Sequence, residues 1–538
     1  MTPQFWPLLC ATAIGLCLSA PHAIQAQTAG PLSVIDWLED PVPTAELPRA
    51  PRVAAPAAPA RPKIKEPAVA RSGTAPKVTT SALGAGPAQN VGLAPPELTG
   101  IAPDLWARSD PDEVAKQINS LPDLGLPAGD TLLFTLLLTE AQPPVSGPKD
   151  QDRLTLARMR KLMSLGAVDP ALALAEQANA DTSPELFDLW ADLALLVGTE
   201  DTACGALSRG PHLSKNTALR IFCDARSGNW DTAALTFGSA QALDLLPRDT
   251  LAVLDRFLNP DLFEDADPLP VPRKIDPLTF RLFETIGEPL PTSPLPRAYA
   301  VADLRDIAGW KSQLEAAERL TRTGALPDNR LLGLYTNRKA AASGGIWDHV
   351  RAIQSLDTAL QEGDVETVSK SLPFAWGEMK RAELEVSFST LFYDRLKDLD
   401  LTGAAAPIAA RMGLLSPEYE TASQTLAPIT LAGVDNSLLR AVAIGEVSQS
   451  LRNDPPPQAL PRAVFDAFNA PTPRSDWIDM AKNQRLGEAL LRTLESLRDG
   501  ARGDSRALRD ALGTLRALGL EDTARRASLQ ILLQERDT

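Results

Sequence analysis

The chain has 538 residues, of which 44% are hydrophobic, 22% charged and 5% aromatic, and its formal net charge at pH 7 is −15. This apolar content is enough for a large core and excludes a globally disordered chain. The negative charge argues against a nucleic-acid-binding protein, which needs a dense cationic face. The 47 prolines are about twice the usual ~5% share, so we expect part of the chain to lie outside any packed core.

Residues 1–26 have the features of an export signal. Positions 5–20 are uncharged and mostly apolar, and Ile24-Gln25-Ala26 forms an acceptable cleavage site. The apolar stretch is short for a membrane span, which needs about 20 residues. We therefore expect an exported, periplasmic protein, and an uncleaved inner-membrane anchor is the alternative.

Cleavage after Ala26 would leave two cysteines, Cys204 and Cys223. Two cysteines so close in sequence predict one disulfide bond in an oxidising compartment. A bridge over a loop of this length contributes on the order of 3 kcal/mol in the chain-entropy model. The alternative is a pair of buried thiols that never form a bond.

Residues 27–103 predict a disordered tether. Positions 41–100 hold 12 Pro and 14 Ala and no aromatic residue, a composition that favours extended chain. The segment 49–77 carries one acidic residue, Glu66, and seven basic ones: Arg49, Arg52, Arg61, Lys63, Lys65, Arg71 and Lys77. One interpretation is a solvated linker, and the other is contact with an anionic partner: peptidoglycan, a membrane surface or the protein's own acidic body.

A short apolar motif precedes the basic segment, in the sequence PLSVIDWLEDP at residues 31–41. Ser33 followed by Asp36 is typical of a helix N-terminus. A turn or two of helix would place Val34, Trp37 and Leu38 on one face. Together with Ile35 these residues form a possible docking motif. A frayed terminus or a part of the folded body is the alternative.

From residue 104 onward the apolar residues mostly recur at i, i+3 and i+4, which predicts an all-α fold. The strongest pattern there is an internal repeat, Gly-x-x-Asp-x-Ala. Glycine suits the left-handed end of one helix, the acid suits the first turn of the next, and alanine lets the two helices approach. The four copies are Gly166, Asp169, Ala171; Gly198, Asp201, Ala203; Gly228, Asp231, Ala233; and Gly519, Asp522, Ala524. Such hairpins must stack, because none can bury its apolar face alone.

The stretch SGNWDTAALTFGSA resembles the turn and second helix of a tetratricopeptide-type repeat, at Gly228, Trp230, Asp231, Ala233, Phe237 and Ala240. The resemblance covers residues 150–245 and a hairpin near 505–535, although the first helices lack the family's Trp and Leu-Gly pattern. It implies a tetratricopeptide-like solenoid. The layout is also similar to that of a group of exported alphaproteobacterial proteins, some labelled antifreeze-glycopeptide-like, but the Ala-Ala-Thr array of that label is absent.

Proline clusters divide the helical part. We predict a helical solenoid at 104–259, a Pro-rich connector at 260–296, a middle helical lobe at 297–425 and a C-terminal helical segment at 426–538. The connector also holds an acidic patch that lacks calcium-ligand spacing, so a solvated loop is expected: Asp261, Glu264, Asp265 and Asp267.

The sequence contains no recognisable catalytic motif. It has no nucleophile elbow, P-loop, H-E-x-x-H or dinucleotide glycine motif. His212 and His349 are too few for a His-rich metal site, so we expect neither metal nor cofactor.

The sequence thus favours a non-enzymatic scaffold or adaptor that binds protein segments in the cell envelope. Its groove would be formed around residues 154–164, 184–197 and 214–226. The alternative is a peptidoglycan-associated protein, either a wall-binding module or an enzyme similar to lytic transglycosylases. The chain resembles the helical superhelix of those enzymes but lacks the Glu-Ser and Gly-rich Met-Gln segments of their catalytic domain.

Overall fold

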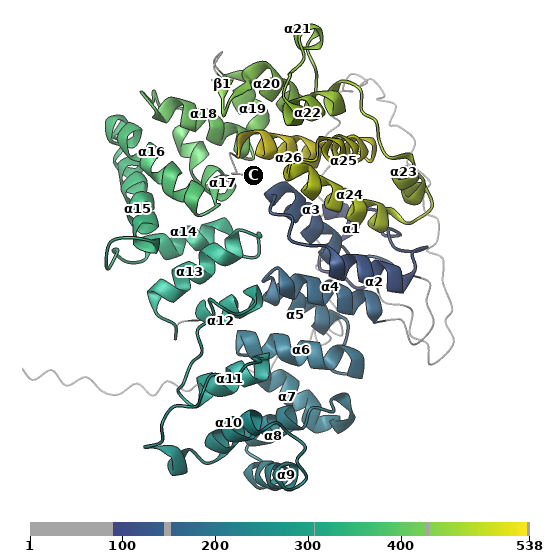
Figure 1. Ribbon diagram of the computed structural model, residues 1–538, viewed down its shortest axis with the longest axis vertical. Helices are drawn as coiled ribbons and strands as arrows, with labels where there is room; N and C mark the ends of the chain where they lie inside the picture. The colour runs from purple at the N-terminus through teal and green to yellow at the C-terminus, as the bar shows by residue number, and fades with distance from the viewer. Residues whose placement is uncertain (1–89, 145–151, 306, 427–429, 535–538) are drawn as a thin grey trace, which may run out of the picture. The chain divides into compact units, whose positions relative to one another are not determined.

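The computed structural model describes residues 90–144, 152–305, 307–426 and 430–534 (Figure 1). In these ranges the chain is predominantly α-helical with almost no strands, which confirms the predicted all-α class. The only regular strands there are two residues long and antiparallel, β1 (Thr430–Leu431) and β2 (Val434–Asp435). The predicted signal, the motif at 31–41 and the basic segment at 49–77 lie outside the described residues.

The helices of the described chain fall into three successive groups. The first is α1 (Pro96–Thr99), α2 (Pro111–Ser120), α3 (Pro127–Leu138), α4 (Arg153–Ser164), α5 (Val168–Gln177), α6 (Pro184–Val197), α7 (Glu200–Arg209), η2 (Pro211–Leu213), α8 (Thr217–Arg226) and α9 (Trp230–Ala242). The second is α10 (Arg248–Leu258), η3 (Pro260–Phe263), α11 (Pro277–Thr285), η4 (Arg297–Tyr299), α12 (Ala300–Asp303), α13 (Trp310–Thr321), α14 (Asp328–Thr336), α15 (Ile346–Glu362), α16 (Val365–Arg381), α17 (Glu385–Leu396), α18 (Ala405–Leu415) and α19 (Tyr419–Gln424). The third is α20 (Asn436–Ile444), α21 (Gln449–Asn453), α22 (Ala459–Asn469), α23 (Ser475–Lys482), α24 (Leu486–Ala501), α25 (Ser505–Ala517) and α26 (Glu521–Leu533).

Several helices begin at a capping side chain followed by proline. Asp110 accepts hydrogen bonds from two backbone N–H groups of α2, and Pro111 occupies the first helical position, where no N–H is needed. Ser183 caps α6 in the same way. Asp276 caps α11 and is followed by Pro277. Local sequence therefore sets where these helices start.

Helices α4 to α9 pack one against the next in chain order. The turn glycines Gly166, Gly198 and Gly228 have φ of +85°, +88° and +81°, the left-handed conformation that side chains disfavour. The alanines of these repeats, Ala171, Ala203 and Ala233, are buried. Close helix contact at small residues thus holds this stack together.

After α10 the chain returns along the stack. Helix α11 packs against α6 and α10, α12 against α6, and η4 against α4 (Figure 1). The Thr323 hydroxyl donates to the Leu165 carbonyl at 2.8 Å. The predicted connector at 260–296 therefore contains a helix, α11, which buries Leu278, Phe280, Leu282 and Phe283.

Helices from near the two ends of the described chain contact each other. Helix α3 packs against α24 and α26. The backbone N–H of Ala128 donates to Oε1 of Gln530 at 2.9 Å, across 402 positions of sequence. The indole of Trp106 lies directly against Gly487, where a Cβ would come within 2.0 Å of a ring carbon.

The packed part begins before the predicted boundary at residue 104. The buried guanidinium of Arg158 donates to the carbonyls of Val91 at 2.8 Å, Leu137 at 2.6 Å and Thr139 at 3.0 Å. Residues 90–103, which we expected to belong to the tether, are thus held by the helical body. Within the described ranges, no helix combines the length and apolar content needed to cross a membrane.

Candidate functional site

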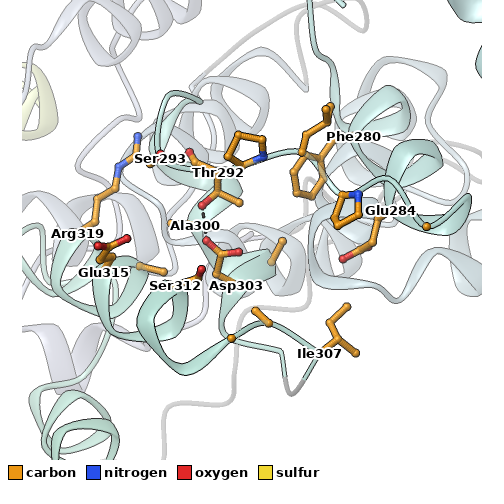
Figure 2. A pocket seen from close by; sticks show the side chains of 18 residues that line it. Phe280, Glu284, Thr292, Ser293, Ala300, Asp303, Ile307, Ser312, Glu315 and Arg319 are labelled. Atoms are coloured by element: carbon orange, nitrogen blue, oxygen red, sulfur yellow. Dashed lines mark hydrogen bonds between the residues drawn. The ribbon is translucent and has the colours of Figure 1, made fainter. Parts of the chain in front are cut away.

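A cavity with a volume of about 620 Å³ lies in the described part of the chain. It lies between α11, the segment 287–293, α12 and α13 (Figure 2). This size falls within the range of about 300–1,000 Å³ that is usual for ligand pockets.

One part of the cavity wall is apolar. Phe280 of α11 and Leu290 are buried, and their side chains border the cavity together with Pro289 and Pro291. Ile307 lies at the opposite edge and is 69% exposed, which is high for an aliphatic side chain (Figure 2). An apolar ligand group would therefore find contact on two sides.

The polar groups of the cavity gather around Asp303, the last residue of α12. Figure 2 shows its carboxylate facing Thr292, whose hydroxyl donates to Asp303 Oδ2. Burial raises the pKa of Asp303 above its ordinary value, and the Thr292 hydrogen bond and the charge of Arg305 act in the opposite direction. Ser312 and Glu315 of α13 complete this side.

Other charges of the wall are already engaged. Arg319 donates to the Thr292 carbonyl at 3.1 Å and to the Leu295 carbonyl, so it ties α13 to the proline-rich segment. Glu284 is paired with Arg281 and Arg305. Arg319 is thus directed at backbone carbonyls, and the Glu284 carboxylate is paired with two arginines.

The predicted disulfide is present. Cys204 of α7 and Cys223 of α8 are joined by a bond of 2.05 Å, with Cα atoms 4.9 Å apart. Both residues are buried, and the bridge links consecutive helices of the stack.

The repeat positions lie at helix junctions. Gly519 has φ of +82°, like the other three turn glycines. The four acids are in the first turns of α5, α7, α9 and α26: Asp169, Asp201, Asp231 and Asp522. Ala524 is buried, as are the other three alanines. These residues hold helix turns together and do not gather into one site.

The helices expected to form the groove, α4, α6 and α8, are contacted by the returning chain. Helix η4 covers part of α4, α11 and α12 cover part of α6, and α10 covers part of α8. The cavity forms within this returning layer and not on α4, α6 or α8.

The two histidines have different environments. His212 is exposed in η2. His349 lies between Glu318 and Glu378, and its side chain is 15% exposed. Among the described residues, no group of three or more His, Cys, Asp or Glu side chains is arranged to hold a metal ion.

The cavity residues were missed from the sequence. Thr292, Asp303 and Arg319 belong to three segments without a shared motif, and only the proline-rich run 287–296 marks the neighbourhood. Comparison of the chain with models of protein families, with curated proteins and with solved structures finds no match in any of the three.

Proposed function

We propose that the protein is a non-enzymatic exported scaffold or adaptor that binds protein segments in the cell envelope. The observation that carries this proposal is the cavity of about 620 Å³ between α11, α12 and α13, with apolar walls and a few polar groups. Binding sites usually combine these two features, because apolar contact supplies affinity and polar groups fix orientation.

The location proposed here is the periplasm. The Cys204–Cys223 bond supports it, because disulfides persist mainly in oxidising compartments. The uncharged apolar stretch at residues 5–20, which lies outside the described part of the chain, supports export.

The helical packing that we propose is a tetratricopeptide-like solenoid over residues 150–245. Positive φ at the turn glycines and buried alanines one turn into the following helices support it. Solenoids of this kind commonly bind extended or helical segments of other proteins.

The test is crosslinked affinity purification of the protein from its own cells. A Ser312→Trp variant fills the cavity from α13, and Thr390→Trp adds the same side chain at an exposed position of α17. We expect one protein partner to be captured with the unmodified chain and with Thr390→Trp, but not with Ser312→Trp. Equal capture with all three, at equal thermal stability, would exclude the cavity as the binding site.

The alternative proposal is a peptidoglycan-associated protein. It is favoured by the seven basic residues against one acid at 49–77. Such a protein should sediment with purified peptidoglycan, and the bound fraction should fall as salt is raised. Replacing the seven basic residues by Ser should abolish sedimentation, whereas Ser312→Trp should leave it unchanged.

A further inference from the structure

The cavity contains a carboxylate that is not neutralised. Among the described residues, no Lys, Arg or His forms an ion pair with Asp303, whose hydrogen bond comes from the neutral Thr292 hydroxyl. The nearby Arg305 is directed to the Glu284 carboxylate and to the Ala302 carbonyl. Asp303 is thus half-buried beside an arginine whose Nε and Nη2 groups donate to other acceptors.

In the described part of the chain, the other charged groups that border the cavity have partners other than Asp303. Glu315 of α13 is also acidic, and its ion pair with Lys311 is long, at 3.5 Å, and on the surface. Arg319 donates to two carbonyls of the segment 292–295. Glu284 of α11 is matched by two arginines. Asp303 and Glu315 are thus the two lining carboxylates that no arginine pairs with among the described residues, and Arg319 adds a positive charge that interacts electrostatically with Asp303.

The apolar walls have the right chemistry for the stem of a basic side chain. Lys and Arg carry three or four methylene groups below the charged end, and these pack well on apolar surface. Phe280, Leu290 and Ile307 provide such a surface. Figure 2 shows Phe280 and Ile307 around the same space as Asp303.

We propose that the cavity binds a basic side chain, lysine or arginine, of the partner segment, and that Asp303 supplies the opposing charge. This inference rests on the proposed function and names the chemistry that its binding site selects. A cation would stabilise the ionised form of a carboxyl that burial disfavours, which is consistent with the raised pKa of Asp303. The ligand would in turn gain a charge-assisted hydrogen bond in a partly desolvated site.

The test uses three capped tripeptides, Ac-Ala-Lys-Ala-NH2, Ac-Ala-Nle-Ala-NH2 and Ac-Ala-Glu-Ala-NH2, titrated into the whole protein and followed by calorimetry. Norleucine (Nle) keeps the stem of lysine without its ammonium group. We expect the lysine peptide to bind at least about tenfold more tightly than the norleucine peptide, and the glutamate peptide to bind most weakly. Equal affinity for lysine and norleucine would overturn the proposal.

Asp303→Asn should remove the preference for lysine and leave the norleucine peptide bound as before. The matched control is Asp328→Asn on α14, since Asp328 is also a half-buried carboxyl with a raised pKa and a hydroxyl partner, Ser387, but does not border the cavity. That variant should keep the preference. If the preference for the lysine peptide is kept in Asp303→Asn, another acidic residue binds the cation, and the proposed role of Asp303 is wrong.

The outcomes for the proposed function are separate. If Ser312→Trp abolishes partner capture while no peptide shows a preference for lysine, the binding function stands and the basic side chain is wrong. If a partner is captured equally by all variants and no peptide binds, the cavity is not the binding site and the basic side chain is wrong as well; if no partner is captured by any of them, the binding function is wrong.

Discussion

His349 on α15 places its Nδ1 atom 2.7 Å from Oε1 of Glu318 on α13. The Glu318 side chain is 5% exposed, so this contact joins two helices in the interior of the protein. The same Oε1 accepts a hydrogen bond from the Tyr335 hydroxyl at 2.6 Å, and Nε2 of His349 lies 3.7 Å from Glu378. Four consecutive helices therefore meet at one polar cluster.

The first prediction concerns this cluster. Replacing His349 by Phe removes one of the partners of the buried Glu318 and Glu378 carboxylates, which keep Tyr335, Arg322 and Arg381, and should lower the free energy of unfolding by about 1–3 kcal/mol. Urea unfolding followed by circular dichroism measures the change. His212→Phe is the control, because His212 is exposed and should change stability by no more than about 0.5 kcal/mol. Similar effects of the two substitutions would mean that the cluster is not a stabilising contact.

The second prediction concerns the disulfide. The double variant Cys204→Ser/Cys223→Ser should lose on the order of 3 kcal/mol of stability, mainly because its unfolded chain is less restricted. A protein lacking residues 1–26, denatured without reductant, should contain no free thiol. A count of two free thiols would contradict the bond.

The third prediction concerns the turn between α8 and α9. Gly228 has φ of +81°, and no atom lies within 4 Å of where its Cβ would be, so any cost of a side chain comes from the backbone alone. Gly228→Val should destabilise the protein by about 1–2 kcal/mol.

The control for Gly228→Val is Gly238→Ala, within α9, where the added Cβ also meets no atom but the backbone is helical. That change should stabilise by about 0.5–1 kcal/mol, since alanine is the better helix former. Both variants can be compared by urea unfolding. An unchanged stability of Gly228→Val would show that the turn tolerates a side chain.

The fourth prediction concerns pH. Burial, together with the negative charges of Asp276 and Asp188, raises the pKa of Asp192 from 3.8 to about 7. Between these two values the folded state holds a proton that the unfolded chain has lost. The free energy of unfolding therefore falls as pH rises, by at most about 1.4 kcal/mol per pH unit from this one group.

Asp192→Asn removes this titration and resembles the protonated side chain in shape. The variant should match the unmodified protein near pH 4 and exceed it in stability by at least about 1 kcal/mol at pH 8. Urea unfolding of both proteins between about pH 4 and pH 8 gives the difference between their free energies of unfolding. The contributions of the other carboxyl groups cancel in this difference because both proteins contain them. A difference in stability between the two proteins that does not vary with pH would contradict the raised pKa of Asp192.

Some of these features could be predicted from the sequence and others could not. The all-α class follows from apolar spacing, and the disulfide follows from the two cysteines that would remain if the predicted signal were cleaved. Helix α11 was missed because nine prolines in 260–296 outweighed the Asp276-Pro277 start signal. The cavity depends on how α11, α12 and α13 pack, and spacing along one segment carries no information on such contacts.

The contact of α3 with α24 and α26 has a consequence for the order of folding. Ala128 and Gln530 meet only when almost the whole described chain is present, so the N-terminal helices cannot complete their packing as they emerge. Contacts over such long sequence separations slow folding and prolong the exposure of unpaired apolar faces. The helices around Ala128 therefore leave part of their apolar surface uncovered until α26 has been synthesised and has packed against α3.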